Sequence, residues 1–141
     1  MGSSGIEILK GREGLLELAS RDNVDVLLNG LVGAAGMEPT LKAIEAGIDV
    51  ALSNKESLVM AGDIIQQAMK KSGAQLFPVD SEHSAIWQCL VGENIDDVRR
   101  LILTGSGGPF RSREINTFDD ITVEEALNHP NWDMGRKITI D

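Results

Sequence analysis

Two short blocks of the sequence place polar or glycine residues directly after a predicted strand. Pro78–His83 ends an apolar run that begins at Ala74, and it holds two carboxylates, a hydroxyl and an imidazole. Leu103–Phe110 follows a second predicted strand and is rich in glycine and hydroxyl groups. Open α/β sheets bind their ligands at the carboxyl ends of their strands. Acidic side chains there, together with a turn able to hold an anion, indicate a metal and a phosphorylated ligand.

The two carboxylates of the first block are Asp80 and Glu82. Hard divalent cations such as Mg²⁺ and Mn²⁺ prefer carboxylate oxygens and keep positions open for substrate and water. In a second interpretation both residues cap a helix N-terminus, where negative charge is stabilised by about 0.3–1 kcal/mol. His83 suits acid–base chemistry, but a histidine packed at a domain boundary is the simpler interpretation. Spacing alone leaves these alternatives open.

Glycines and a lysine at two other predicted strand ends also suit anion binding. The turn Gly105–Gly108 can aim backbone N–H groups and the Ser106 hydroxyl at phosphate oxygens, although a plain tight turn needs the same glycines. In Asn54–Glu56, Lys55 could hold a substrate oxygen or neutralise a developing negative charge. The other interpretation of Lys55 is an exposed helix N-terminus, where its charge would oppose the helix dipole.

The segment His129–Gly135 combines an imidazole, an indole and a thioether with little periodicity. It is interpreted either as a flap that closes over a ligand and excludes water, or as a surface loop anchored by Trp132. Trp87 and Cys89 lie in a helical apolar run, and both are predicted to be core residues.

Strands and helices alternate before Asp80, which predicts right-handed crossovers and a parallel sheet. The predicted strands are Val24–Leu28, Ile48–Leu52 and Leu76–Val79. The predicted helices are Gly14–Ser20, Pro39–Ala46, with Pro39 in the first helical position, and Lys55–Lys71. A tight turn is expected at Gly33–Gly36, and helix ends are expected at Gly47 and Gly73.

The pattern changes after Asp80, so a domain boundary is expected near Val79–Ser81, which divides the chain into 1–79 and 80–141. The elements predicted beyond it are a helix at Ser81–Leu90 with Ser81 as N-cap, a strand at Val98–Thr104, a capping box at Thr122–Glu125 and a strand-like tail at Lys137–Ile140.

Composition restricts the class of protein. The chain has 141 residues, of which 42% are apolar, so a packed core is expected. A net charge of −9 argues against broad nucleic-acid binding, which needs clustered basic residues. A single cysteine forms no internal disulfide and points to a reducing compartment, and no apolar run approaches the roughly 18 residues of a membrane span.

Taken together, the chain resembles the 1-deoxy-D-xylulose 5-phosphate reductoisomerase family. The segments that carry the resemblance are, in order, Val32–Gly36, Ser53–Val59, Pro78–His83, Leu103–Phe110 and His129–Lys137 with Ile138–Asp141. The likeness implies the α/β fold class: the second half of a Rossmann-like NADPH-binding domain, followed by the start of an α+β catalytic domain. It implies isomerisation and NADPH-dependent reduction of 1-deoxy-D-xylulose 5-phosphate to 2-C-methyl-D-erythritol 4-phosphate, with Mg²⁺ or Mn²⁺ and possibly Co²⁺ as the metal, in non-mevalonate isoprenoid synthesis.

The resemblance also implies roles for individual residues. The implied metal ligands are Asp80 and Glu82. The implied substrate contacts are Lys55, Ser81, Glu82, Ser106, His129 and Trp132, of which Lys55, Glu82 and His129 would be catalytic. The implied NADPH contacts are Asn54, Glu56 and Gly135, and Trp132 and Met134 would belong to the closing flap. The implied partners are a small phosphorylated sugar and a second copy in a homodimer, without nucleic acid or membrane, in the cytoplasm or a plastid.

Family members also contain a glycine-rich pyrophosphate turn and a Ser-Ala-Thr-Met-Met-Asn-Lys-Gly-x-Glu stretch, neither of which occurs here. The chain is therefore expected to be the middle third of such an enzyme and inactive by itself. An alternative is a catalytically incomplete fold fragment that binds metal or phosphate weakly. An unrelated NAD(P)-dependent oxidoreductase would require all five motifs to coincide by chance.

Overall fold

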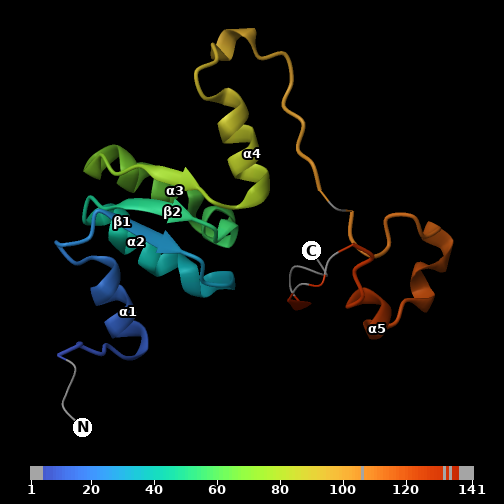
Figure 1. Cartoon of the computed structure of the whole chain (residues 1–141), viewed down its shortest axis with the longest axis horizontal. Coiled ribbons are helices and arrows are strands. Elements are labelled where there is room, and N and C mark those ends of the chain that lie inside the picture. Colours follow the sequence, from blue (N-terminus) through green and yellow to red (C-terminus); the bar gives the residue numbers. More distant parts are fainter. Residues whose placement is uncertain (1–4, 106, 132, 134, 137–141) are drawn as a thin grey trace. The chain divides into compact units, whose positions relative to one another are not determined.

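The computed structural model describes residues 5–105, 107–131, 133, 135 and 136, and the chain divides into two compact units, Met1–Leu101 and Ile102–Asp141. Figure 1 shows the course of the chain. The elements of the first unit are α1 (Gly11–Ala19), β1 (Val26–Asn29), the 3₁₀ helix η1 (Gly33–Gly36), α2 (Met37–Glu45), β2 (Asp49–Leu52), α3 (Lys55–Ser72), β3 (Leu76–Pro78), α4 (Ser81–Leu90) and the 3₁₀ helix η2 (Ile95–Asp97). Those of the second unit are the 3₁₀ helix η3 (Ile115–Asp120) and α5 (Val123–Ala126).

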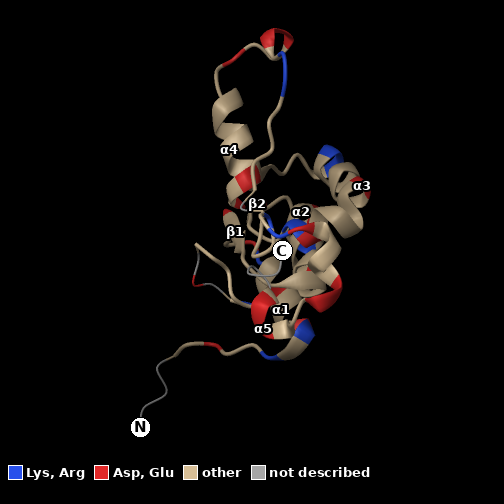
Figure 2. Ribbon diagram, turned by 90° about the vertical axis from the view of Figure 1, so that its right-hand side faces the viewer, with Lys and Arg blue, Asp and Glu red and all other residues tan. Residues whose placement is uncertain are grey.

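The three strands form one parallel sheet in the order β1-β2-β3. Leu27 pairs with Val50, and Leu52 pairs with Pro78. The helices α2 and α3 pack against each other and against one face of the sheet (Figure 2). The parallel α/β arrangement predicted from the alternation of strands and helices is confirmed.

The core of the first unit lies between this sheet face and the two helices. Ile44 of α2 and Ile65 of α3 meet Val50 of β2, and all three are at most 1% exposed. Alternate residues of a strand point to opposite faces. Leu27 accordingly packs against the core, whereas Val26 and Leu28 are 52% and 68% exposed on the other face.

Glycines end the two central helices as the sequence predicts. Gly73 takes φ +82° in the left-handed region and caps α3, and Gly47 takes φ +79° just after α2. α2 begins at Met37, so Pro39 is the third helical residue and not the first. The first four N–H groups of a helix have no intrahelical partner, so proline is tolerated throughout the first turn and does not locate the helix start.

The helix α4 has the predicted bounds, but other predictions about it were wrong. Its N-cap is Asp80, not Ser81, and none of its residues is buried. Trp87 is 46% exposed and Cys89 is exposed, so neither is a core residue. α4 packs on β3, and Trp87 makes an edge-to-face contact with Phe77, with ring centroids 6.4 Å apart. Glu82, Ser84, Ile86 and Leu90 are half-buried, and the other α4 residues are exposed.

The strand predicted at Val98–Thr104 is not formed. Its apolar residues Leu101, Ile102 and Leu103 are 58–69% exposed. Such residues favour a strand, but a strand also needs a neighbour to satisfy its backbone N–H and C=O groups. Within the described residues β3 pairs only with β2, and no segment pairs with 98–104.

The second unit is held by short-range contacts. The capping box at the start of α5 is confirmed, with Thr122 and Glu125 each bonding the backbone N–H of the other. Arg113 lies over the Phe110 ring, 5.7 Å from its centroid, and forms an ion pair of 2.8 Å with Glu125. The predicted tail strand Lys137–Ile140 lies outside the described residues.

Residues of both charge signs occur throughout the described part of the chain. Figure 2 shows acidic and basic residues interspersed on the ribbon. No helix in the described ranges is long and apolar enough to cross a membrane. The two compact units meet between Leu101 and Ile102, because most contacts lie within one unit or the other. This division does not test the domain boundary expected near Val79–Ser81, which stays a prediction.

Candidate functional site at the carboxyl ends of β2 and β3

The parallel ladder brings the ends of β2 and β3 together. Beyond the last paired residues, Val79 N donates to Leu52 O at 2.9 Å, so both chain segments leave the sheet side by side. Each then enters a helix within a few residues: α3 begins at Lys55 and α4 at Ser81. The first residues of these helices are therefore neighbours.

Three charged groups meet at this point. Lys55 Nζ lies 2.6 Å from Asp80 Oδ1 and 3.8 Å from Glu82 Oε2. The two carboxylates thus reach the same ammonium group. The Asp80 side chain is 10% exposed, whereas those of Lys55 and Glu82 are 42% and 37% exposed. The result is one shielded carboxylate with a second carboxylate beside it that is open to solvent.

The second oxygen of Asp80 is held by His83, whose Nδ1 lies 2.7 Å from Oδ2. Burial alone would raise the pKa of Asp80, but the bonds from Lys55 and His83 outweigh it, so this pKa lies below its ordinary value. Asp80 is therefore ionised at neutral pH. His83 is exposed, so the prediction that it packs at a domain boundary was wrong.

Both acids lie at the N-terminus of α4, as the capping interpretation predicts, but the Asp80 side chain does not cap the helix. Asp80 occupies the N-cap position of α4 without a side-chain capping hydrogen bond, and Glu82 lies in the first turn. The Asp80 oxygens pair with the Lys55 ammonium and the His83 imidazole instead. Lys55 thus shows that a positive charge is accommodated between these carboxylates.

The donor chemistry suits a hard cation. Asp80 and Glu82 both lie at the N-terminus of α4, and the pKa of Asp80 is below its ordinary value. Carboxylate oxygens are the ligands that Mg²⁺ and Mn²⁺ prefer. Among the residues that the structure describes, no group of three or more His, Cys, Asp or Glu side chains is arranged to hold a metal ion. The described part of the chain therefore offers two carboxylates toward a metal.

A hollow of about 230 Å³ adjoins the charged cluster. It is lined by Leu52, Lys55, Leu58, Leu76, Pro78, Asp80 and His83. Four of these residues are apolar, and the others are Lys55, Asp80 and His83. A polar cluster beside an apolar wall is typical of small-molecule sites.

Asn54 is buried, and its amide bonds neighbouring backbone and side-chain atoms. It caps α3 by accepting from Ser57 N at 3.0 Å, and its Nδ2 donates to Leu31 O and Gly33 O at 2.5 and 2.9 Å. The structure gives this side chain a local structural role, and its contact with NADPH stays a prediction.

Of the remaining predicted site residues that the structure describes, two belong to the first unit and two to the second. Glu56 is half-buried in the first turn of α3, and Ser81 is exposed at the start of α4. In the second unit His129 is 8% exposed and its Nδ1 accepts from Asn131 N at 3.1 Å. Gly135 is exposed in the same unit. Ser106, Trp132 and Met134 lie outside the described residues, so their roles stay predictions.

The glycine-rich turn has the conformation that its residues suggest. Gly107 and Gly108 take φ +81° and +66°, which side chains rarely adopt. A Cβ on Gly107 would also lie 2.8 Å from Arg111 Cβ. These features satisfy the tight-turn interpretation, and a phosphate-binding role stays a prediction.

Sequence reasoning missed the buried polar residues behind the site. Asn29 and Thr40 bond each other at 2.7 Å, and both are at most 3% exposed. The available signal was Asn29 itself, a polar residue at the end of an apolar strand. Thr40, in the first turn of a helix next to a proline, gives no such signal.

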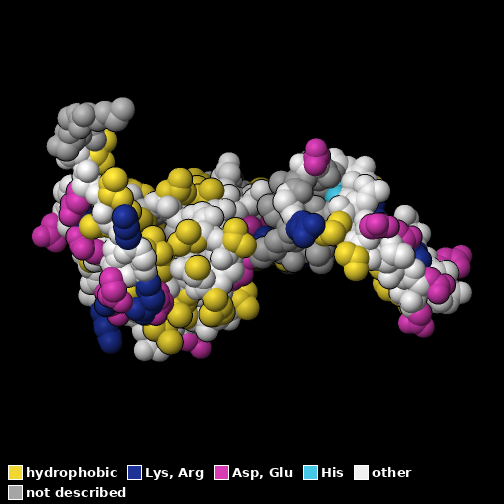
Figure 3. Space-filling view, turned by 90° about the horizontal axis from the view of Figure 1, so that it is seen from below, with side chains coloured by type: hydrophobic (Ala, Val, Ile, Leu, Met, Phe, Trp, Pro, Cys, Tyr) yellow, Lys and Arg dark blue, Asp and Glu magenta, His cyan; other side chains and the backbone are white. Residues whose placement is uncertain are grey.

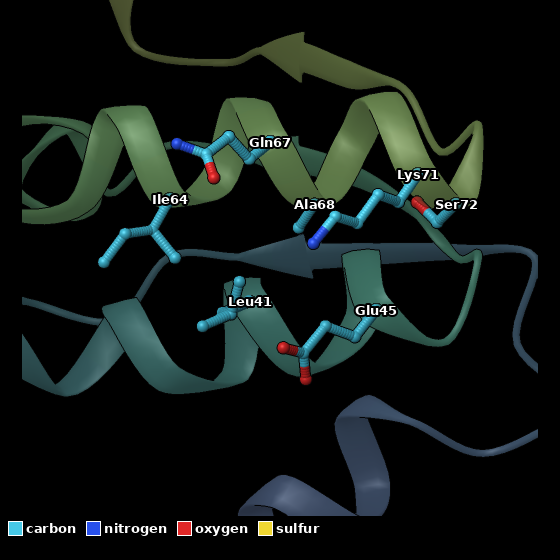
Figure 4. A pocket seen from close by; sticks show the side chains of 7 residues that line it. All are labelled: Leu41, Glu45, Ile64, Gln67, Ala68, Lys71 and Ser72. Atoms are coloured by element: carbon cyan, nitrogen blue, oxygen red, sulfur yellow. The ribbon is translucent and has the colours of Figure 1, made fainter.

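A second hollow of about 310 Å³ lies between α2 and α3. Figure 4 shows its lining residues, which are Leu41, Glu45, Ile64, Gln67, Ala68, Lys71 and Ser72. It shares no residue with the charged cluster.

Taken together, the parallel sheet with charged side chains at its strand ends defines a ligand-binding unit of the Rossmann-like α/β class. Residues 2–62 match the model of the 1-deoxy-D-xylulose 5-phosphate reductoisomerase family, and residues 76–141 match that of the 1-deoxy-D-xylulose 5-phosphate reductoisomerase C-terminal domain. The chain belongs to the 1-deoxy-D-xylulose 5-phosphate reductoisomerase family.

Curated relatives support this assignment. A reductoisomerase of Exiguobacterium sp. (strain AT1b) is 58% identical over 131 residues, which is 93% of this chain and 34% of the relative. One of Chloroherpeton thalassium is 53% identical over 141 residues, or 100% of this chain and 36% of the relative. The chain thus spans about a third of the length of these relatives.

Solved structures agree. A DOX-P reductoisomerase in complex with NADPH, fosmidomycin and magnesium superimposes with a TM-score of 0.82 at 46% identity, covering 93% of this chain and 35% of that one. The enzyme from Zymomonas mobilis in complex with NADPH gives a TM-score of 0.77 at 46% identity, covering 85% of this chain and 31% of that one.

Proposed function

We propose that this chain supplies part of the metal, substrate and nucleotide sites for NADPH-dependent isomerisation and reduction of 1-deoxy-D-xylulose 5-phosphate to 2-C-methyl-D-erythritol 4-phosphate. The observation that carries the proposal is the meeting of Lys55, Asp80 and Glu82 at the carboxyl ends of β2 and β3. Support comes from the relatives named for this activity and from the solved relative that holds NADPH, fosmidomycin and magnesium.

Asp80 and Glu82 would hold the divalent cation. The low pKa of Asp80 keeps its carboxylate charged without a metal present. When bound, the cation would withdraw electron density from substrate oxygens and NADPH would donate hydride. Lys55 stands between the two carboxylates and would turn its ammonium toward a substrate oxygen as the cation takes its place beside them.

The other predicted residues complete the proposal. Ser81, Ser106, His129 and Trp132 would contact the phosphorylated sugar, with Ser106 near the phosphate. Asn54, Glu56 and Gly135 belong to the proposed nucleotide site. The homodimer and the cytoplasmic location implied by the family resemblance are part of the same proposal.

The proposal is tested in a chimera in which this chain replaces the matching segment of the Exiguobacterium relative, which is 58% identical over 131 residues. We expect loss of NADPH absorbance that depends on both 1-deoxy-D-xylulose 5-phosphate and Mg²⁺ or Mn²⁺. A folded chimera without substrate-dependent turnover would contradict the proposal.

A matched measurement addresses the alternative of a catalytically incomplete metal or phosphate binder. The 141-residue chain alone is expected to bind Mn²⁺ weakly and to show no turnover, since its described residues offer only two carboxylates toward a metal. Mn²⁺ binding is read by electron paramagnetic resonance. Turnover by the chain alone would show that the expected inactivity was wrong.

A further inference from the structure

Four buried polar side chains surround the loop Gly30–Gly36 at the carboxyl end of β1. They are Asn29, Thr40, Asn54 and Ser57, and each is at most 3% exposed. They come from the end of β1, from α2 and from the start of α3. No side-chain polar atom buried in the described residues lacks a hydrogen bond. The network is therefore fully paired.

Asn29 and Thr40 hold both ends of the loop. Asn29 Oδ1 accepts from Leu31 N at 3.1 Å, and Asn29 Nδ2 donates to Gly36 O at 2.8 Å. The Thr40 hydroxyl accepts from Asn29 Nδ2 at 2.7 Å and donates to Gly36 O at 2.9 Å. Leu31 and Gly36 are thereby fixed relative to the strand that precedes them.

Asn54 holds the middle of the loop and has no hydrogen-bonding capacity left. An amide side chain has two N–H donors and two oxygen lone pairs. Both donors go to Leu31 O and Gly33 O, and the oxygen accepts from both Ser57 N and Ser57 Oγ. A direct bond from this amide to a cofactor would require one of these four bonds to break.

The backbone approaches Asn54 too closely for any side chain at Gly36. A Cβ there would lie 2.5 Å from Asn54 Cγ and 2.7 Å from its Oδ1. A Cβ on Gly30, in the same loop, would meet nothing within 4 Å. The loop backbone is therefore in close contact with Asn54 at Gly36, whereas Gly30 has room for a side chain.

The outer part of the loop faces solvent. Val32 is 70% exposed, and Ala34 and Ala35 are exposed. A surface of small apolar side chains on a backbone locked from beneath is preorganised for a flat ligand, since little ordering entropy is lost on binding. It lies beside Asn54 and the start of α3, which the proposed function assigns to NADPH.

We propose that Asn54 is a positioning residue, which with Asn29 and Thr40 fixes the loop Gly30–Gly36 so that the exposed loop, and not the Asn54 amide, contacts NADPH. This inference rests on the proposed function. In place of a direct contact between the Asn54 amide and NADPH, the hydrogen bonds of Asn29, Thr40 and Asn54 to the loop, here called the clamp, hold the loop backbone in position.

The decisive variants alter the clamp without altering Asn54. Gly36→Ala places a methyl group against the amide. Its control is Gly62→Ala, which lies within α3 outside the loop and whose Cβ would meet nothing within 4 Å. Thr40→Val removes the hydroxyl at similar volume, and Thr40→Ser retains it. Thr40 is 0% exposed and does not bond Asn54, so it cannot act by touching NADPH.

All four variants are measured in the chimera. For Gly36→Ala and Thr40→Val we expect KM for NADPH to rise about 10-fold, which corresponds to about 1.4 kcal/mol, with kcat changed less than about 3-fold. Mn²⁺ affinity should be unchanged. Gly62→Ala and Thr40→Ser should behave like the parent chimera. This separation of KM from kcat and from metal binding is not expected from general destabilisation.

Each result bears on the proposal. If Gly36→Ala and Thr40→Val bind NADPH as the parent does, the clamp has no positioning role and the inference is overturned. Equal losses of NADPH affinity, kcat and Mn²⁺ affinity would also overturn it, because they indicate a fold defect. If Gly36→Ala does not fold, the Thr40 pair decides. A parent chimera that does not bind NADPH refutes the proposed function, and the inference with it.

Discussion

At the scale of single residues, Lys55 explains why two carboxylates tolerate each other at the end of β3. Its ammonium lies within 4.0 Å of both Asp80 and Glu82. Opposite charge at such a distance favours the ionised form of a carboxylate, whereas burial disfavours it. The Lys55 ammonium, together with the bond from His83, therefore lowers the pKa of Asp80 against the effect of burial.

Lys55→Met is expected to raise the pKa of Asp80, because burial then acts against fewer compensating bonds. Asp80 has a lowered pKa in the folded chain, so its stabilising contribution is present above its unfolded pKa and is lost as pH falls through the folded pKa. In the variant this loss should begin at higher pH. The measurement is the pH dependence of the Asp80 carboxyl carbon shift by NMR. Lys42→Met, which removes only an exposed pair with Glu45, is the control. An unchanged or lower Asp80 pKa in Lys55→Met would contradict this account.

Glu82→Gln should damage turnover more than Ser106→Ala. Glu82 would place a negative charge on the metal, so Glu82→Gln should lower kcat by roughly 100-fold. Loss of a residue that only hydrogen-bonds a metal ligand costs roughly 10- to 100-fold, and loss of a direct ligand should cost at least as much as the upper value. Ser106 would give one of several bonds to a phosphate remote from the reacting carbons, so its loss should mainly raise KM. Both variants are assayed in the chimera at saturating Mg²⁺. A Ser106→Ala variant with a kcat as low as that of Glu82→Gln and an unchanged KM would refute these roles.

At the scale of elements, the short helix α5 depends on its capping box more than on packing. None of its four residues is buried, and Glu125 bonds both Thr122 N and Arg113. The backbone N–H of Thr122 and then Arg113 lower the pKa of Glu125. A lowered carboxyl pKa means that the stabilisation is present above the unfolded pKa and is lost as pH falls through the folded pKa.

Glu125→Gln should therefore weaken α5 at neutral pH and leave it less sensitive to acid. The amide can still accept from Thr122 N, but it has no charge for Arg113 or for the helix dipole. Hydrogen exchange of the α5 amides at neutral and acid pH makes the comparison, with Glu124→Gln on the same turn as control. Equal acid sensitivity of the Glu125→Gln variant and the parent would mean that another group controls α5.

Elements with local signals were predictable from sequence, and those that depend on distant partners were not. Gly47 and Gly73 marked two helix ends, and Thr122 marked a capping box, because each acts on its own turn. The segment 98–104 has strand-forming residues but no neighbouring strand among the described residues, so propensity alone failed there. At the site, the Asp80–Glu82 block was evident from its position after a strand. The Lys55–Asp80 pair and the Asn54 clamp join residues far apart in the sequence, and these contacts are not encoded by local spacing.

At the scale of the whole molecule, the chain exposes much apolar surface relative to its core. Figure 3 shows apolar side chains spread over the first unit in the view from below. Val26 and Leu28 on the open sheet face, and Trp87 on α4, belong to the exposed set. Folding stability must therefore come mainly from the one buried cluster between the sheet, α2 and α3.

Ile44→Ala and Trp87→Ala test this distribution of stability. Ile44 is 0% exposed, so its truncation leaves a cavity and should cost about 2–5 kcal/mol of unfolding free energy. Trp87 is the larger side chain, but it is 46% exposed and its described ring contact is with Phe77, so its loss should cost less than that of Ile44. Urea unfolding of the first unit followed by circular dichroism makes the comparison without relying on indole fluorescence. A Trp87→Ala cost equal to that of Ile44→Ala would mean that α4 is packed in solution as tightly as the core. The placement of stability in the single cluster would then be wrong.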